Sequence, residues 1–208
     1  MACATLAVGS VLAAVQSDAK RILAYSSISH AGFILVGVQA ASDSGVASVM
    51  FYLAAYAVIA VGSFTVVAVL SGHRDDRTGL DTLAGLGTRR PALALGLTIL
   101  LLAQAGVPFT SGFVAKFSVI AAAVEARSYW LAVVAMVSAV IAAFAYLRVV
   151  VAMYFRDSGD EAETAAEASE PGMGLGAGAV IVVAVLLTVA AGIVPGALES
   201  LSSTAAGL

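Results

Sequence analysis

The feature that most constrains this chain is a series of long apolar runs separated by short polar segments. Five of these runs are long enough to cross the roughly 30 Å hydrocarbon core of a bilayer, and a sixth, at the start of the chain, is shorter. The expected spans cover residues 2–17, 22–41, 46–70, 91–126, 128–154 and 175–198. Hydrophobic residues make up 61% of the chain and charged residues 11%, a balance that a water-soluble core cannot hide. The sequence therefore predicts an all-α membrane protein of about six transmembrane helices, surrounded by the lipid bilayer.

The remaining composition excludes several classes of protein. Six of the 13 acidic residues lie in one stretch, 157–172, which is rich in Ala, Glu and Ser and is predicted to be a flexible acidic loop. No basic cluster suggests a nucleic-acid partner. Cys3 is the single cysteine, which excludes an internal disulfide and a cysteine-based metal site. With no phosphate-loop lysine and no metal-ligand spacing, the sequence predicts that this chain binds no cofactor.

The run 91–126 is too long for one straight, untilted span, because a helix of that length would extend about 54 Å. Gly106, Pro108 and Gly112 interrupt it near its middle. Proline removes a helical donor and clashes with the preceding turn, while glycine permits non-helical backbone. We therefore expect a helix break at 106–112, with the run forming either one discontinuous span or two separate crossings.

The distribution of basic residues favours one discontinuous span. In that topology Arg127 lies alone on one side of the membrane, and the other loop arginines and lysines share the opposite side. These are Lys20, Arg21, Arg74, Arg77, Arg89, Arg90, Arg148 and Arg156. Because basic loops are retained in the cytoplasm, these loops are predicted to be cytoplasmic and both termini to lie outside.

Lys116 follows the break by one helical turn, which places it near the middle of the bilayer. Helix breaks at this depth survive where protein or a water-filled cavity satisfies the freed backbone groups, and they recur at transport sites. A lysine there is costly to charge, so it is suited to picking up and releasing a proton. The alternative is a structural lysine that extends to an interface or pairs with a helix carbonyl.

Further polar residues lie within the expected spans. Ser27 and His30 share a helix face, where the histidine is equally suited to a proton relay and to a helix–helix hydrogen bond. Gln104 is expected to satisfy backbone freed by the break, and Thr110 and Ser111 are expected to do likewise. A polar stripe at helical spacing favours packing against a neighbouring helix over contact with a file of water; it comprises Tyr52, Tyr56 and Ser63.

Two segments carry a family resemblance. Asp18–Gly32 resembles the D/N-x-K-R-x-L-A-Y-S-S-I-x-H-x-G signature of the antiporter-like subunits of NADH-quinone oxidoreductase (respiratory complex I). Gly106–Phe117 resembles their A-G-I-P-P-T-x-G-F-x-G-K-F break, with departures at Phe109 and Ala115. Within the first segment, the sequence Tyr-Ser-Ser-Ile-Ser-His at 25–30 is similar to that of the subunit N type in particular.

The resemblance implies a fold and a set of site residues. The family has two inverted five-helix repeats, each with a discontinuous helix that bears a key lysine, and this chain resembles the second repeat plus the final helix. By that likeness Lys116 is the channel lysine of the second half, Lys20 belongs to the central polar axis, and His30 lines the same axis. Without the likeness, Lys20 beside Arg21 is as well explained as an orientation anchor.

The resemblance also implies a function. The chain is expected to be a non-redox, proton-translocating membrane-arm subunit of a bacterial inner-membrane complex that uses NADH and quinone. Its expected partners are the other membrane-arm subunits, especially antiporter-like ones. The first repeat has no counterpart in the sequence, so we expect no activity from this chain alone. The alternatives are a subunit of a multi-subunit cation/proton antiporter and a truncated copy with a structural role.

Overall fold

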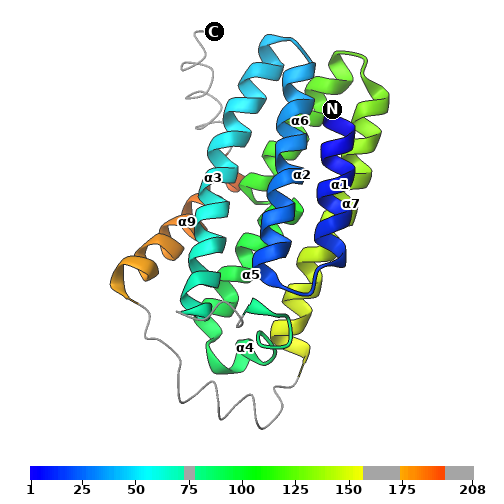
Figure 1. Cartoon of the computed structure of the whole chain (residues 1–208). Coiled ribbons are helices and arrows are strands. Elements are labelled where there is room, and N and C mark those ends of the chain that lie inside the picture. Colours follow the sequence, from blue (N-terminus) through cyan, green and yellow to red (C-terminus); the bar gives the residue numbers. More distant parts are fainter. Residues whose placement is uncertain (73–77, 157–173, 195–208) are drawn as a thin grey trace.

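The described residues of the computed structural model, 1–72, 78–156 and 174–194, form a helical bundle (Figure 1). The only β feature among them is an isolated bridge between Asp18 and Gly79. The predicted loop 157–172 lies outside the described residues. The helices are α1 (Ala2–Val15), α2 (Ala19–Gln39), α3 (Asp43–Ser71), α4 (Leu86–Arg89), α5 (Pro91–Ala105), α6 (Ser111–Glu125), α7 (Tyr129–Phe155) and α9 (Leu175–Ile193). The all-α class is confirmed.

Within the described residues, four helices are long and apolar enough to cross a membrane: α2, α3, α7 and α9. Helices α1 and α5 are shorter and apolar. In Figure 1, α1, α2 and α3 alternate in direction, and α7 runs back beside α1. Helices α5 and α6 follow one another in the same direction and traverse the bundle once between them. Helix α9 leans away from the bundle at its start and approaches α3 at its end.

Side-chain caps determine where several helices begin. Asp18 accepts a hydrogen bond from the amide of Arg21 at 3.0 Å, and Ser42 accepts one from the amide of Gly45 at 3.1 Å. Each cap satisfies a backbone donor that the first turn would otherwise leave unpaired. Helices α2 and α3 therefore begin at Ala19 and Asp43, earlier than the apolar runs that start at 22 and 46.

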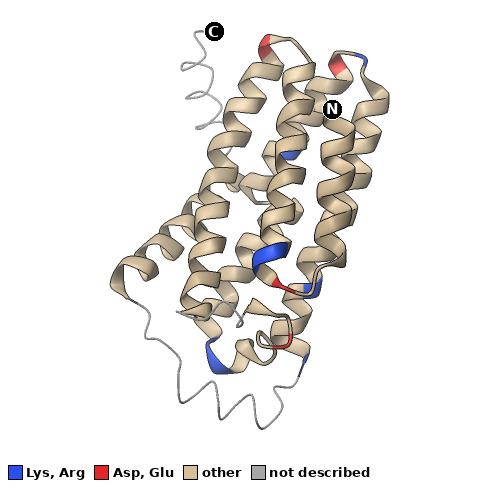
Figure 2. Cartoon of the chain, in the orientation of Figure 1, with Lys and Arg blue, Asp and Glu red and all other residues tan. Residues whose placement is uncertain are grey.

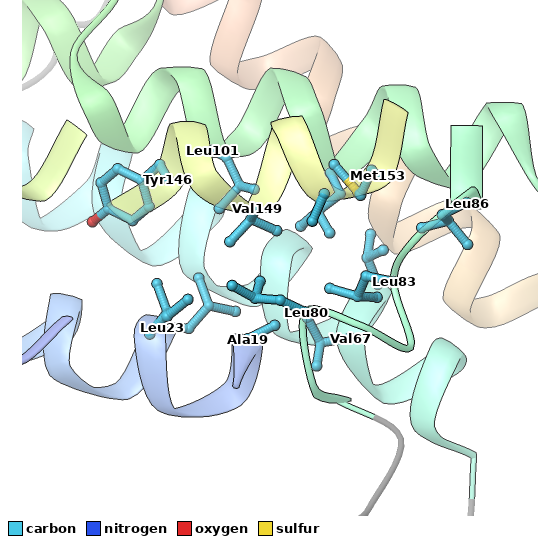
Figure 3. Packing of buried hydrophobic residues seen from close by; sticks show 14 of the residues in the cluster. Ala19, Leu23, Val67, Leu80, Leu83, Leu86, Leu101, Tyr146, Val149 and Met153 are labelled. Atoms are coloured by element: carbon cyan, nitrogen blue, oxygen red, sulfur yellow. The ribbon is translucent and has the colours of Figure 1, made fainter. Parts of the chain in front are cut away.

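The largest buried apolar cluster joins α2, α3, α5 and α7 at the end of the bundle that carries α4 (Figure 3). Val149 and Met153 of α7 lie across from Ala19 of α2, and Leu80 and Leu83 close the space between them. The connection between α3 and α5, which lies outside the spans expected from the sequence, thus contributes buried leucines. A second cluster fills the opposite half, around Phe33, Tyr52 and Leu131.

Charge and hydrophobicity on the surface follow a membrane pattern. Most charged positions of the described residues lie toward the two ends of the bundle (Figure 2). Lys116, within α6, is buried. Large apolar side chains are exposed between the ends, for example Val140 at 72%, Leu186 at 63% and Phe144 at 58%. In water such exposure would be costly, whereas lipid solvates it.

Candidate functional site

The backbone leaves the helix between Ala105 and Ser111. Gly106 has φ 89°, a left-handed conformation that favours glycine, and its amide bonds back to the carbonyls of Leu102 and Ala103. Thr110 starts α6: its hydroxyl oxygen accepts from the amide of Phe113 at 3.3 Å and donates to the Val107 carbonyl at 2.7 Å. Thr110 therefore satisfies backbone groups at the break, as the sequence suggested.

Gly112 is a correction to the expected break. The sequence placed it in non-helical backbone, but Ser111 and Gly112 form the first turn of α6, so the interruption covers 106–110. Glycine is required there for a different reason. A Cβ atom on Gly112 would lie 1.9 Å from the carbonyl oxygen of Ala103, so only glycine lets the two half-helices meet this closely.

Lys116 reaches back from α6 to the end of α5. Its Nζ donates to the carbonyl oxygen of Gln104 at 2.6 Å and to that of Ala105 at 3.1 Å, and its side chain is 6% exposed. These carbonyls belong to the last turn of α5, where intrahelical donors run out and the helix dipole is negative. The ammonium group is thus held by backbone acceptors that the break itself supplies. From the sequence, the alternative to a proton-handling role was a structural lysine that pairs with a helix carbonyl. The two hydrogen bonds of Lys116 are of this kind.

Aromatic rings connect Lys116 to α2. The Lys116 Nζ lies 5.1 Å from the ring centroid of Phe33, within the range of a cation–π interaction. The Phe33 and His30 ring centroids are 6.4 Å apart on neighbouring turns of α2. Phe33 thus neighbours both the Lys116 ammonium group and the His30 ring. Lys116 and His30, two of the residues predicted to handle protons, therefore lie in one site.

His30 is 4% exposed and hydrogen-bonded through both ring nitrogens. Its Nδ1 lies 2.7 Å from the Tyr52 hydroxyl, and its Nε2 lies 3.2 Å from the Tyr146 hydroxyl. The ring also stacks on Tyr56 with centroids 4.2 Å apart, and the Tyr56 hydroxyl donates to Ser27 at 2.7 Å. Three tyrosines from α3 and α7 thus surround one histidine of α2.

This arrangement makes the hydrogen bonds depend on the protonation of His30. In neutral imidazole one ring nitrogen donates and the other accepts, so one of Tyr52 and Tyr146 donates while the other accepts. In a doubly protonated ring both nitrogens donate, and both hydroxyls must accept. Protonation of His30 would therefore require the tyrosine hydroxyl that donates to the neutral ring to turn its proton toward a different acceptor.

Gln104 has a different role from the one expected. Its side chain does not bond to backbone freed by the break: Nε2 donates to the Ser63 hydroxyl at 2.9 Å, and Oε1 accepts from the Ser26 hydroxyl at 3.4 Å. Gln104 thus joins α5 to α2 and α3 beside the Lys116 site. The polar stripe Tyr52, Tyr56 and Ser63 makes helix–helix hydrogen bonds at all three positions.

Lys20 is not brought into this cluster. It lies in the first turn of α2, ten residues before His30, which is about 15 Å along the helix axis. Its expected place on the polar axis stays a prediction.

Tyr146 is a site residue that the sequence reading missed. It lies within the apolar helix α7 and is fully buried. A tyrosine in the middle of a lipid-facing pattern needs a hydrogen-bond partner, and that need is the signal that marks it. Arg148, on the same helix, donates to the carbonyl of Ala14 at the end of α1.

Comparison with known proteins agrees with this fold. A family model described as NADH:quinone oxidoreductase/Mrp antiporter, TM, matches residues 1–142, and the chain belongs to this family of membrane proteins.

Individual relatives and solved structures show which members of this family the chain resembles. NADH-quinone oxidoreductase subunit N 1 of Solibacter usitatus is 40% identical over 208 residues, covering 100% of this chain and 42% of that protein. A chain of respiratory complex I from Thermus thermophilus aligns with TM-score 0.79 and 32% identity, over 96% of this chain and 43% of that one. A chain of the Mrp complex from Dietzia sp. aligns with TM-score 0.83 and 25% identity, over 99% of this chain and 45% of that one. The chain thus spans less than half the length of these proteins.

Proposed function

We propose that this chain is the proton-translocating second half of a subunit N-type membrane-arm component of a bacterial proton-pumping NADH-quinone oxidoreductase. Subunit N relatives of about 40% identity and the likeness to complex I support this assignment. In the proposal, other subunits bind NADH and quinone and carry out the redox chemistry. This chain binds no cofactor, has no redox activity alone, and works in contact with other antiporter-like subunits in the cell membrane.

The observation that carries the proposal is the buried Lys116 at the helix break, beside the His30 network. Its hydrogen-bond partners are carbonyl oxygens, so no carboxylate among them fixes its charge. Two positive charges this close in a low-dielectric interior repel strongly. Lys116 and His30 therefore hold a proton alternately, and a charge that approaches or leaves in a neighbouring subunit moves the proton between them.

The test uses the full-length subunit in the assembled complex, with proton pumping and NADH:quinone turnover measured in vesicles. Lys116→Ala removes the proton carrier, and Lys116→Arg keeps a charge that cannot be released in this range. Both variants are expected to lose most pumping while the complex still assembles. Arg156→Ala, which removes an exposed ion pair with Asp81, is the control and is expected to pump normally. Normal pumping by an assembled Lys116→Ala complex would refute the role.

A second candidate is a subunit of a multi-subunit cation/proton antiporter, favoured by the likeness to the Mrp complex. Affinity purification of the tagged chain from its own membranes, followed by mass spectrometry, separates the two. Copurification with redox subunits supports the proposed function. Copurification with antiporter subunits and no redox subunits supports the second candidate, and isolation of the chain without partners supports a truncated copy with a structural role.

A further inference from the structure

A cavity of about 100 Å³ lies between α3, α6 and α9, on the side of the helix break that faces α9. Most of its wall is apolar. The lining residues are Phe51, Ala54, Ala55, Val58, Ser111, Leu187, Thr188 and Ala191. Neither Lys116 nor His30 is among them. Ser111 and Lys116 lie five residues apart on α6, about 140° around the helix, so the cavity faces away from the Lys116 site.

Two buried hydroxyls line this cavity. Ser111 is 2% exposed and Thr188 is 1% exposed, and neither side-chain oxygen has a hydrogen-bond partner within the described part of the chain. Burying an unpaired hydroxyl is unfavourable by about 1–3 kcal/mol on the scale of protein mutations. Two such groups at one cavity therefore indicate a polar occupant.

The two hydroxyls lie where α9 packs onto the break. A Cβ atom on Gly192 would lie 2.4 Å from the backbone of Phe109 and Thr110, so the end of α9 touches the non-helical segment directly. Thr188 is one turn earlier on α9, and Ser111 is the first residue of α6. An occupant that bonds to both hydroxyls would tie α9 to the start of α6.

We propose that this cavity is an internal water site, in which a small cluster of water molecules bridges Ser111 and Thr188. A water molecule takes about 30 Å³ in the liquid, so the cavity has room for about three. The waters satisfy the hydroxyls and hold α9 against the break. The inference does not depend on proton translocation by Lys116.

The rival occupant is a lipid acyl chain. A larger apolar groove of about 450 Å³ between α3 and α9 shares Val58 and Leu187 with the cavity. A hydrocarbon chain that extended from the groove into the cavity would leave both hydroxyls without partners. The two occupants therefore predict opposite effects when the hydroxyls are removed.

The first test measures thermal unfolding of the full chain in lipid nanodiscs for Ser111→Ala, Thr188→Val and the double variant. If water bridges the hydroxyls, each single change lowers Tm by about 2–4 °C, and the double variant loses clearly less than the sum. A rise in Tm for the single variants means dry hydroxyls and overturns the proposal. Additive losses mean that the hydroxyls share no water, and they also overturn it.

The second test detects water directly and does not depend on small differences in stability. In a Cys3→Ala background, Ser111→Cys and Thr188→Cys are transferred to D2O, and infrared spectroscopy of the S–H stretch reports whether each thiol proton exchanges with water. Ser10→Cys is the matched control, since Ser10 is fully buried and its hydroxyl donates to the Leu6 carbonyl at 2.7 Å. Rapid exchange at 111 and 188 with none at 10 supports the water site. An absence of exchange at both positions overturns it.

Discussion

At the scale of single residues, three buried polar side chains of the candidate site each have a hydrogen-bond partner on another helix. Lys116 bonds to carbonyls of α5, His30 to tyrosines of α3 and α7, and Gln104 to hydroxyls of α2 and α3. Interhelical hydrogen bonds in membranes contribute modestly, about 0.6 kcal/mol on average. Their value here lies in fixing the geometry of ionisable groups.

Tyr146→Phe tests the histidine cluster. The change removes the hydroxyl at 3.2 Å from His30 Nε2 and leaves the ring packing intact. We expect a loss of stability of about 0.6–1.7 kcal/mol, measured as a lower Tm, and a reduced pumping rate in the full-length subunit because one relay partner is lost. Tyr129→Phe, at a residue that is 59% exposed, is the control and should change neither. Unchanged pumping in Tyr146→Phe would remove Tyr146 from the relay.

At the scale of elements, the divided helix α5–α6 organises the site. Glycine serves it in two distinct ways: Gly106 by its left-handed backbone, and Gly112 by letting α6 approach α5. The approach puts Lys116 within reach of the last carbonyls of α5. If α5 and α6 lay further apart, Lys116 and the last carbonyls of α5 would lose these hydrogen bonds to each other.

Gly112→Ala is expected to be strongly destabilising, because the added Cβ would meet backbone that cannot move without separating the half-helices. We expect a loss of several kcal/mol, about 4 or more, seen as a large fall in Tm or failure to fold. Gly96→Ala on α5 is the matched control: its Cβ would lie 3.2 Å from the Ile181 side chain, which can shift. Equal effects of the two substitutions would contradict the close approach.

At the scale of the whole molecule, charge is distributed unequally between the two ends. Figure 2 shows most of the basic positions of the described residues at the end of the bundle that carries α4. The helix ends there include Lys20 and Arg21 of α2, Arg89 and Arg90 before α5, and Arg156 after α7. Arg127 lies after α6, at the opposite end. The positive-inside rule then predicts that the α4 end is cytoplasmic.

Sidedness can be measured with single cysteines in the full-length subunit with Cys3 replaced. Thr82→Cys, at the α4 end, should be protected from an impermeant maleimide in intact spheroplasts and label after lysis. Ser44→Cys, at the opposite end, should label in both. The reverse pattern would mean that the basic loops face outward and that the charge rule does not set the orientation of this protein.

The sequence by itself determined the class, the approximate ranges of the apolar helices and the helix break that precedes Lys116, because lipid requires long apolar runs and because glycine and proline break a helix locally. It placed helix starts late, since capping by Asp18 and Ser42 extends helices beyond their apolar residues. The tertiary structure alone decided which partners each polar group meets. The contacts of Lys116 with α5 carbonyls and of His30 with Tyr146 depend on how helices distant in the sequence pack, and no local pattern encodes that packing. The same packing brings Ser111 and Thr188 to one cavity.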